Sequence, residues 1–205
     1  SLLLPLGLLV RRPPSWKPSR AGDANDRSPI SLPTNVTVAW ISVAVICCCT
    51  CMAVPLMHLV PLIQDKGYGA TEAGSVLFSM LVVAVVGRLA FGKLADMIGP
   101  VQAWFAASLW QTLMVVFFVQ IESLTGFYIY AMTFGFGYAG VMTGVLATTS
   151  KLTPRSRAGS SMGIVMAFAF LGHGLGGYQG GLFFDMTGSY ATSFGNAALA
   201  GSLNL

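Results

Sequence analysis

Apolar stretches alternate with short polar breaks along most of this 205-residue chain. An α-helix rises about 1.5 Å per residue, so about 20 residues are needed to cross about 30 Å of hydrocarbon. The first five stretches reach that length, while the sixth is shorter and is expected to be truncated. The pattern predicts an all-α membrane protein, a bundle of six transmembrane helices with spans at about 36–63, 73–94, 101–121, 124–149, 160–184 and 190–205.

The first 34 residues differ in character from the rest of the chain. Ser1–Val10 is apolar and precedes Arg11 and Arg12, whereas a secretory signal carries its charge ahead of its apolar core. We therefore expect residues 1–10 to be the end of a preceding transmembrane helix. Residues 11–34 are rich in Pro, Ser, Arg and Asp, a composition that favours a polar linker.

Composition supports a lipid bilayer as the main partner. Hydrophobic residues make up 55% of the chain and charged residues 9%, against roughly 25% charged residues in globular proteins. The formal net charge is +4, but the basic residues lie in loops between apolar stretches and form no continuous basic face. This arrangement argues against a nucleic-acid partner.

The distribution of Lys and Arg predicts the orientation. With six spans, one side of the membrane receives the linker and the loops near 93 and 151–157, whereas the other side has only Lys66. The positive-inside rule makes the basic side cytoplasmic, and we expect a plasma membrane of the bacterial inner-membrane type. The basic residues on that side are Arg11, Arg12, Lys17, Arg20, Arg27, Lys93, Lys151, Arg155 and Arg157.

Glycine motifs occur within two of the predicted spans. Gly135–Gly140 and Gly172–Gly177 both follow the G-x-G-x-x-G pattern of dinucleotide-binding loops. Such a loop needs a preceding strand, which an apolar span does not provide. Four-residue glycine spacing is instead typical of membrane helices in close contact. We therefore predict helix packing at these glycines, including Gly144 and Gly180.

Two further patterns suggest enzyme or metal chemistry. Ser161 lies in a stretch with the letters of a serine nucleophile elbow, and His173 follows it, which raises an intramembrane serine protease of the rhomboid type. Both residues lie on one predicted helix about 18 Å apart, beyond the roughly 3 Å reach of a catalytic pair. The cysteines of Cys47–Cys51 cannot all turn to one metal ion from a single helix. We predict no catalytic residues, no metal site and buried, reduced cysteines.

Three ionisable side chains inside the spans are candidates for substrate contact, because such groups are costly in hydrocarbon. Arg88 lies roughly 12 Å inward from the cytoplasmic loop, and it either extends to the headgroups or faces an interior where it could bind a carboxylate. His173 is near the middle of its span, where it could contact substrate, carry a proton or bond a neighbouring carbonyl. His58 lies between Pro55 and Pro61, which could make that helix a gate.

The segment Gly87–Pro100 resembles the loop signature of the major facilitator superfamily. Its G-x-L-x-D-x-x-G pattern has Gly92, Asp96 and Gly99 at the signature positions. The resemblance implies that Gly92 permits close helix contact and that Asp96 latches one conformation by pairing with loop donors or a helix N-terminus. The signature's basic residues are replaced by Met97 and Pro100.

Within the superfamily, His58–Gly67 and Arg88 look like the monocarboxylate and oxalate/formate transporter branch. An arginine at the position of Arg88 binds substrate carboxylate in that branch. Animal members also carry Asp one turn earlier, where this chain has Ala84, so their proton-coupling scheme is not carried over. The resemblance implies that residues 35–205 form the C-terminal half of a twelve-helix protein, built from inverted three-helix repeats, with the N-terminal six-helix half missing.

Together these inferences predict a fragment of a secondary active transporter that moves a small organic anion by alternating access. The expected substrate is a monocarboxylate, the driving force is a gradient of protons, another ion or substrate, and no cofactor is expected. Arg88 would anchor the carboxylate, His173 and His58 would contact substrate, and the signature loop would be the conformational latch. The alternatives are the protease and a non-transporting membrane receptor or assembly subunit.

Overall fold

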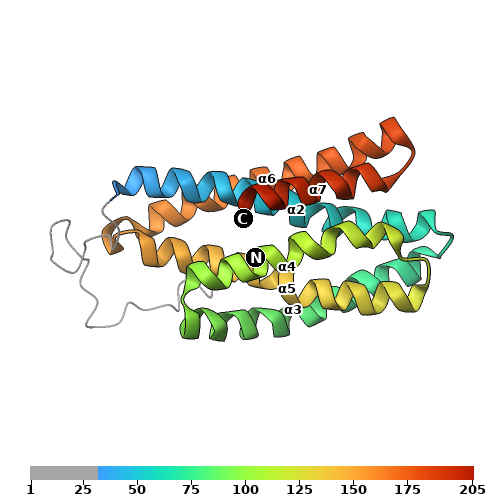
Figure 1. Cartoon of the computed structure of the whole chain (residues 1–205), viewed down its shortest axis with the longest axis horizontal. Coiled ribbons are helices and arrows are strands. Elements are labelled where there is room, and N and C mark those ends of the chain that lie inside the picture. Colours follow the sequence, from blue (N-terminus) through green and yellow to red (C-terminus); the bar gives the residue numbers. More distant parts are fainter. Residues whose placement is uncertain (1–31) are drawn as a thin grey trace, which may run out of the picture.

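The computed structural model describes residues 32–205, which form helices joined by short turns (Figure 1). The predicted all-α bundle of six helices is confirmed for this part of the chain. Residues 1–31, with the expected helix end and most of the expected linker, lie outside the described residues. The helices are α2 (Thr34–Asp65), α3 (Ala70–Ile98), α4 (Pro100–Val115), α5 (Leu124–Leu152), α6 (Ala158–Thr187) and α7 (Tyr190–Asn204), with the 3-10 turns η2 (Val116–Gln120) and η3 (Arg155–Arg157).

Five of these segments, α2 to α6, are long and apolar enough to cross a membrane when α4 is counted together with η2. Helix α7 has 15 residues, fewer than the about 20 that a crossing requires. Because the chain reverses at each turn, the start of α2, the α3–α4 turn and the α5–α6 turn meet at one end of the bundle (Figure 1). We call this the basic end, because the loops predicted to be basic lie there; Lys66 lies at the opposite end.

Local sequence explains where the helices begin and end. Gly99 ends α3 with φ of 97°, a backbone conformation that side chains disfavour. Pro100 then begins α4, where its missing N–H costs no hydrogen bond. Ser123 and Ser189 cap α5 and α7, because their hydroxyl oxygens accept hydrogen bonds from backbone N–H groups of the first turn at 3.1 and 3.2 Å. Short turns therefore separate long helices.

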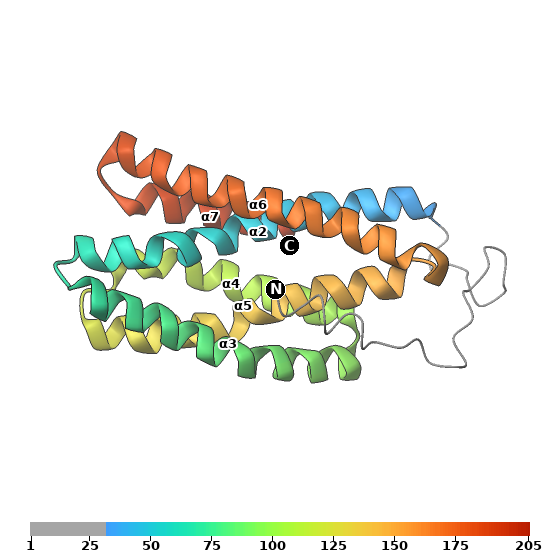
Figure 2. The same ribbon diagram turned by 180° about the vertical axis from the view of Figure 1, so that it is seen from behind.

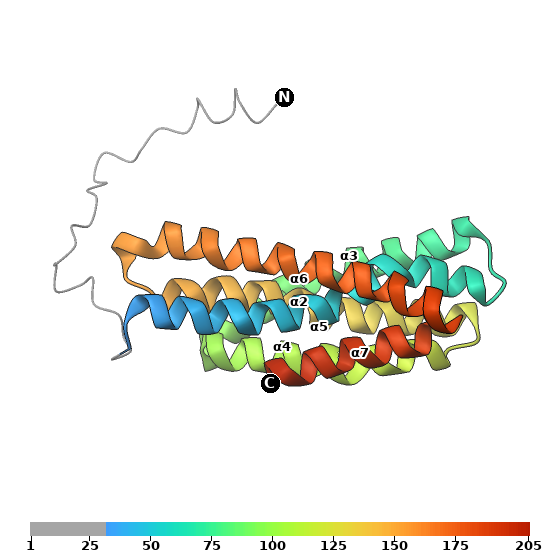
Figure 3. The same cartoon turned by 90° about the horizontal axis from the view of Figure 1, so that it is seen from above.

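The helices form two groups of three. Helices α2, α6 and α7 lie together on one side of the bundle, and α3, α4 and α5 on the other (Figures 1 and 2). The most extensive contacts are α3 with α5 and α2 with α6. When α2, α3 and α4 are matched in chain order with α5, α6 and α7, the contact of α3 with α5 corresponds to the contact of α6 with α2. Figure 3 shows α7 beside α2 and α4 on a third face of the bundle.

Glycines of α5 allow α3 and α4 to lie against its backbone. At each of them an added Cβ atom would overlap an atom of the neighbouring helix. The pairs are Gly135 with Met80 and Gly140 with Phe91 toward α3, and Gly137 with Trp110 and Gly144 with Trp104 toward α4. The prediction that the Gly135–Gly140 motif serves helix packing is confirmed.

Helix α6 packs on α2 by the same device. Gly172, Gly176 and Gly180 share one face of α6, and Cβ atoms there would meet the Ile46 carbonyl, the Thr50 carbonyl and the His58 ring respectively. The Thr50 hydroxyl also donates to the Gly172 carbonyl at 3.2 Å. The packing predicted for this glycine run is therefore confirmed, and the two glycine-lined contacts, α3–α5 and α2–α6, are the two main seams of the fold.

The cysteine cluster lies on α2 and faces the interior. Cys48, Cys49 and Cys51 are fully buried, and Cys47 is partly buried. Cys49 packs beside Gly172 of α6. The predicted burial is confirmed for Cys48, Cys49 and Cys51, which pack as small apolar side chains.

Candidate functional site

Arg88 lies on α3 at the α3–α5 seam. The residue before it, Gly87, is buried so tightly that a Cβ atom would overlap the carbonyl oxygen of Phe136 on α5. Arg88 itself is exposed and forms no hydrogen bond or ion pair with any residue from 32 to 205. Its charge interacts with the phenol of Tyr138 on α5. The seam thus presents a guanidinium, without a carboxylate partner, within the apolar length of α3.

Tyr138 is the neighbour that sequence reasoning missed. Its ring is 8% exposed and stacks on Phe134 at 5.7 Å with an interplanar angle of 9°. Its hydroxyl makes no hydrogen bond within the described residues. Gly135 and Gly140 hold α5 against α3 on either side of Tyr138, which brings its phenol within electrostatic range of Arg88. A cation and a hydroxyl donor together suit an anionic oxygen ligand.

His173 lies on α6 at the α2–α6 seam and is partly buried. Its Nδ1 is 2.9 Å from the carbonyl oxygen of Ala169, one turn earlier on the same helix. The Cys49 thiol of α2 lies beside the ring, and Phe170 is at 6.5 Å between ring centroids. Nδ1 therefore serves local bonding, and the Cys49 thiol is the other polar partner of the ring.

His58 lies on the same seam, toward the end opposite the basic loops. Its Nε2 is 2.9 Å from the Gly177 carbonyl of α6, and its ring fits against Gly180. Tyr190 of α7 is 5.7 Å away between ring centroids. Pro55 and Pro61 lie inside α2, on either side of His58 in sequence, and α2 continues through both. In this structure His58 ties α2 to α6, which is a packing role.

The signature loop joins α3 to α4 at the basic end. An added Cβ at Gly92 would meet nothing within 4 Å, so the close helix contact expected there is not made among the described residues. Asp96 is exposed and has no hydrogen bond or ion pair within residues 32–205. Gly99 supplies the positive φ of the turn, and the Lys151 ammonium of α5 lies near it, 3.8 Å from where a Cβ would be. The loop is therefore positioned by Gly99 and is open on the side of Asp96.

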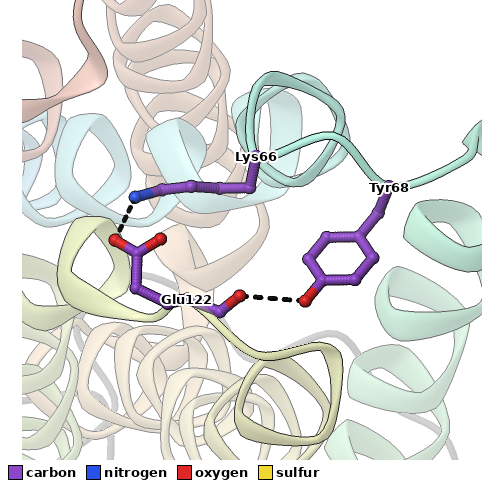
Figure 4. A network of polar contacts seen from close by, with 3 residues as sticks. All are labelled: Lys66, Tyr68 and Glu122. Carbon is purple, nitrogen blue, oxygen red and sulfur yellow. Dashed lines mark hydrogen bonds and ion pairs between the residues drawn. The ribbon is translucent and has the colours of Figure 1, made fainter.

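The end opposite the basic loops contrasts with this open turn. Lys66 and Glu122 form the one ion pair of the described residues, with Nζ and Oε1 2.5 Å apart. The Tyr68 hydroxyl donates to the Glu122 carbonyl at 2.9 Å (Figure 4). It also accepts from the Leu124 N–H at 3.1 Å. These contacts join the α2–α3 turn to the beginning of α5.

The candidate residues do not converge on one closed cavity. Within residues 32–205 no hydrogen bond, ion pair or ring contact joins Arg88 to His173 or His58; they lie on different seams. A cavity of about 330 Å³ between α2 and α6 near the basic end is lined by five apolar side chains together with Asn35, Ser42, Arg157 and Ser161, and not by Arg88, His173 or His58. A substrate site formed by Arg88 and a histidine would therefore need a further wall or a ligand between the seams.

Ser161 and His173 do not form a catalytic pair. Both lie on α6, which runs without interruption from Ala158 to Thr187. Twelve residues of continuous helix separate their backbones by about 18 Å, and Ser161 is buried against α2. The geometry gives the serine protease alternative no support.

Comparison with known proteins identifies the family. Residues 1–177 match the model of the Major Facilitator Superfamily. The chain belongs to the major facilitator superfamily. It is 31% identical to monocarboxylate transporter 13 of Rattus norvegicus over 156 residues, which cover 73% of this chain and 36% of the relative. An uncharacterized MFS-type transporter of Bacillus subtilis is 28% identical over 147 residues, covering 65% of this chain and 34% of the relative.

The match extends to the branch suggested by His58–Gly67 and Arg88. Monocarboxylate transporter 13 of Bos taurus is 30% identical over the same length, again with 73% of this chain and 36% of the relative covered. The chain thus spans about a third of the length of these superfamily relatives. The predicted resemblance to the superfamily and to its monocarboxylate-like branch is confirmed.

Proposed function

We propose that this chain is the C-terminal six-helix half of a twelve-helix secondary active transporter, and that the whole protein moves a small organic anion, a monocarboxylate in the first instance, by alternating access. The observation that carries the anion assignment is Arg88, an exposed cation within a membrane-spanning helix with no partner among residues 32–205. The names of the rat and bovine relatives support a monocarboxylate.

Arg88 and Tyr138 would bind the carboxylate. A guanidinium presents two parallel N–H donors to the two oxygens of a carboxylate, which fixes its orientation as well as its position. The Tyr138 hydroxyl, which has no hydrogen bond within the described residues, would donate to one of the same oxygens. Binding the anion would also neutralise a cation whose exposure to hydrocarbon is costly.

His173 would be the polar contact or proton carrier on the opposite seam. Its Nδ1 is held by the Ala169 carbonyl and its ring also contacts the Cys49 thiol, so substrate or a proton would compete with that thiol for the ring. His58 is the weaker candidate for substrate contact, because its Nε2 already bonds the Gly177 carbonyl. In this proposal the proton is carried on the α2–α6 seam, whereas the carboxylate is bound on the α3–α5 seam.

The remaining parts of the proposal concern the whole protein. Residues 1–10 would end the sixth helix, and residues 11–34 would be the central cytoplasmic linker. The basic end would face the cytoplasm of a plasma membrane, in line with the bias of Lys and Arg. The N-terminal half would supply the missing wall of the cavity and a partner for the Gly92–Gly99 latch, since Asp96 is unpaired among residues 32–205. This half alone should therefore not transport.

The test is uptake of labelled monocarboxylates by the complete twelve-helix protein carrying Arg88→Ala or Arg88→Lys. Loss of a bidentate charge-assisted contact should lower uptake at subsaturating substrate by roughly 10- to 100-fold. Arg88→Lys should recover only part of it, because an ammonium cannot bind both oxygens in the same way. Arg155→Ala, which removes an exposed cation at the basic end outside the signature loop, is the control and should leave uptake near that of the unmodified protein.

Protein amount in the membrane must be equal among these variants. Unchanged uptake by Arg88→Ala at equal amount would refute the anion assignment. Saturable binding of a monocarboxylate without flux in proteoliposomes would replace the transporter proposal with that of a membrane receptor.

A further inference from the structure

The cavity of about 330 Å³ between α2 and α6 lies where both helices begin, at the basic end of the bundle (Figure 1). The exposed side chains of Asn35 and Arg157 stand at its mouth, close to the two helix starts. Ser42 and Ser161, which are buried, line it further in. The rest of its lining is apolar and consists of Val38, Ala39, Val43, Ile164 and Phe168. The cavity therefore has a charged mouth and an apolar body.

The cavity extends from the helix starts into the apolar length of both helices. Ser42 is eight residues beyond the first residue of α2, and Phe168 is ten residues beyond the first residue of α6. At 1.5 Å per residue these positions lie about 12 and 15 Å from the helix starts. Trp40 of α2 is 70% exposed, as is typical of aromatic side chains at a membrane interface. A bound molecule would thus have its charged end among headgroups and its apolar part in hydrocarbon.

The mouth of the cavity favours a negative charge. Arg157 forms no ion pair with any residue from 32 to 205. The starts of α2 and α6 both lack a side-chain cap among the described residues, and the first N–H groups of a helix carry partial positive charge. Two helix N-termini and one guanidinium therefore lie at the same opening. Phosphate oxygens accept hydrogen bonds from both kinds of donor.

Ser42 points to a polar group of the ligand inside the cavity. Its hydroxyl is 3% exposed, lines the cavity and has no hydrogen-bond partner in the described part of the chain. Buried polar groups in folded proteins are almost always hydrogen-bonded, because leaving one without a partner costs free energy. An ester carbonyl between a headgroup and an acyl chain would lie at this depth and would accept the hydrogen bond of Ser42.

A second cavity gives room for a second acyl chain. It has a volume of about 250 Å³ and is lined by Val36, Ala39, Trp40 and Val43. The first cavity shares Ala39 and Val43 with it. Residues four apart lie one above the other on a helix, so these two form a ridge of α2 with one cavity on either side. A ligand with two acyl chains would straddle this ridge.

We propose that the two cavities bind an anionic phospholipid of the cytoplasmic leaflet, with the phosphate at Arg157 and the helix starts, an ester at Ser42 and the acyl chains on either side of Ala39 and Val43. The cytoplasmic leaflet is the one rich in anionic lipids. The choice of leaflet rests on the proposed function, in which the basic end faces the cytoplasm. The lipid would join the starts of α2 and α6.

The first experiment measures lipid binding to the complete, delipidated protein in detergent by native mass spectrometry. Dioleoylphosphatidylglycerol is the probe, and dioleoylphosphatidylcholine, which has no net charge, is the lipid control. We expect one phosphatidylglycerol to bind at least about fivefold more tightly than phosphatidylcholine, and Arg157→Gln to remove that preference. Arg155→Gln is the matched control, because it removes a nearby exposed cation that does not line the cavity, and it should keep the preference. Equal affinity for the two lipids, or equal losses in the two variants, would overturn the proposal.

The second experiment locates the lipid. Phosphatidylglycerol with a diazirine on one acyl chain is photolysed with the complete protein, and labelled peptides are identified by mass spectrometry. Labels should fall on residues 34–44 and 160–170 and should disappear in Ala39→Phe, which fills the ridge from an exposed position and so should leave the fold intact. Labels elsewhere, or unchanged labelling in Ala39→Phe, would mean that the N-terminal half covers the cavities, and the proposal would fail.

A soluble competitor separates a lipid from a free anion. An excess of sn-glycerol 3-phosphate, which has the phosphate but no acyl chain, should leave the photolabelling unchanged. Displacement of the label would show that phosphate alone occupies the mouth and would overturn the lipid assignment. Neither experiment requires transport, so a protein that takes up no monocarboxylate would contradict the proposed function and leave the lipid site to be decided by these measurements.

Discussion

The α3–α5 and α2–α6 seams use the same packing and carry different chemistry. In each seam a helix backbone lies against glycines of the neighbouring helix. The two seams occupy equivalent positions when α2–α4 are matched in chain order with α5–α7. The α3–α5 seam presents Arg88 and the Tyr138 hydroxyl, neither bonded among the described residues. On the α2–α6 seam, by contrast, His58 and His173 each bond a backbone carbonyl at 2.9 Å.

The two seams share their glycine packing and differ in their polar side chains. Glycines at equivalent seams indicate that close backbone contact is what the fold requires, because dispersion and packing drive helix association in lipid. The unequal side chains underlie the different tasks that we propose for the two seams. A fixed cation suits anion binding, while a titratable histidine suits proton exchange. Changes at the glycines should therefore affect both seams alike, and changes at the polar side chains should not.

The largest effect is expected from adding a methyl group to either seam. Gly87→Ala places a Cβ onto the Phe136 carbonyl, and Gly176→Ala places one 2.5 Å from the Thr50 carbonyl. Neither backbone atom can move alone, so the helices must separate, at a cost of about 1–3 kcal/mol by analogy with overpacked cores. Both variants should lose monodisperse protein at lower temperature in a detergent thermal-shift assay with size-exclusion detection.

Matched controls exist on the same two helices. Gly74 of α3 and Gly174 of α6 have nothing within 4 Å of an added Cβ. Alanine there should leave stability unchanged or improve it by up to about 1 kcal/mol, since Ala is the better helix former. Equal losses at all four positions would mean that the seams are no tighter than the rest of the bundle, and the comparison would lose its structural basis.

An intermediate effect is expected at His173, and it should be specific to coupling. His173→Gln removes the titratable nitrogen but keeps a polar side chain on the α2–α6 seam. We expect the complete transporter to lose the roughly tenfold accumulation that a gradient of one pH unit can drive, while substrate exchange in the absence of a gradient continues. The measurement compares gradient-driven uptake with counterflow in proteoliposomes.

His58→Gln provides the contrast on the same seam. An amide N–H can replace the ring nitrogen as donor to the Gly177 carbonyl, so packing and coupling should both survive. If His58→Gln abolished gradient-driven uptake and His173→Gln did not, the roles assigned to the two histidines would have to be exchanged.

The sequence alone predicted the features that depend on a single helix in a hydrocarbon environment. Long apolar stretches require helices, and the glycines at 135–144 and 172–180 could be assigned to packing because no strand precedes them. The partner of each glycine could not be predicted, because it depends on which helices pair and in what register. Gly87 shows the limit: it was noticed as part of a loop signature, but its contact with Phe136 lies across about fifty residues of chain.

The candidate site was predictable only in part for the same reason. Arg88, His58 and His173 were found because ionisable groups are rare in spans. Tyr138 gave no comparable signal, since tyrosine is common in membrane helices, and its importance comes from its position beside Arg88. The ion pair at the end opposite the basic loops was also missed: Lys66 was noted as the one basic residue of that side, whereas Glu122, far away in sequence, pairs with it.

The smallest effect is expected at Tyr138, where the change tests one hydroxyl of the α3–α5 seam. Tyr138→Phe removes one hydroxyl and keeps the ring that stacks on Phe134, so the α3–α5 seam should retain its thermal stability. Loss of one hydrogen bond to a carboxylate should raise the KM for monocarboxylate uptake by about three- to tenfold, with little change in maximal rate. Concentration-dependent initial rates in the complete transporter measure both quantities. An unchanged KM together with intact stability would reduce Tyr138 to packing and leave Arg88 as the sole distinction between the seams, whereas lower stability would show that its hydroxyl serves the fold.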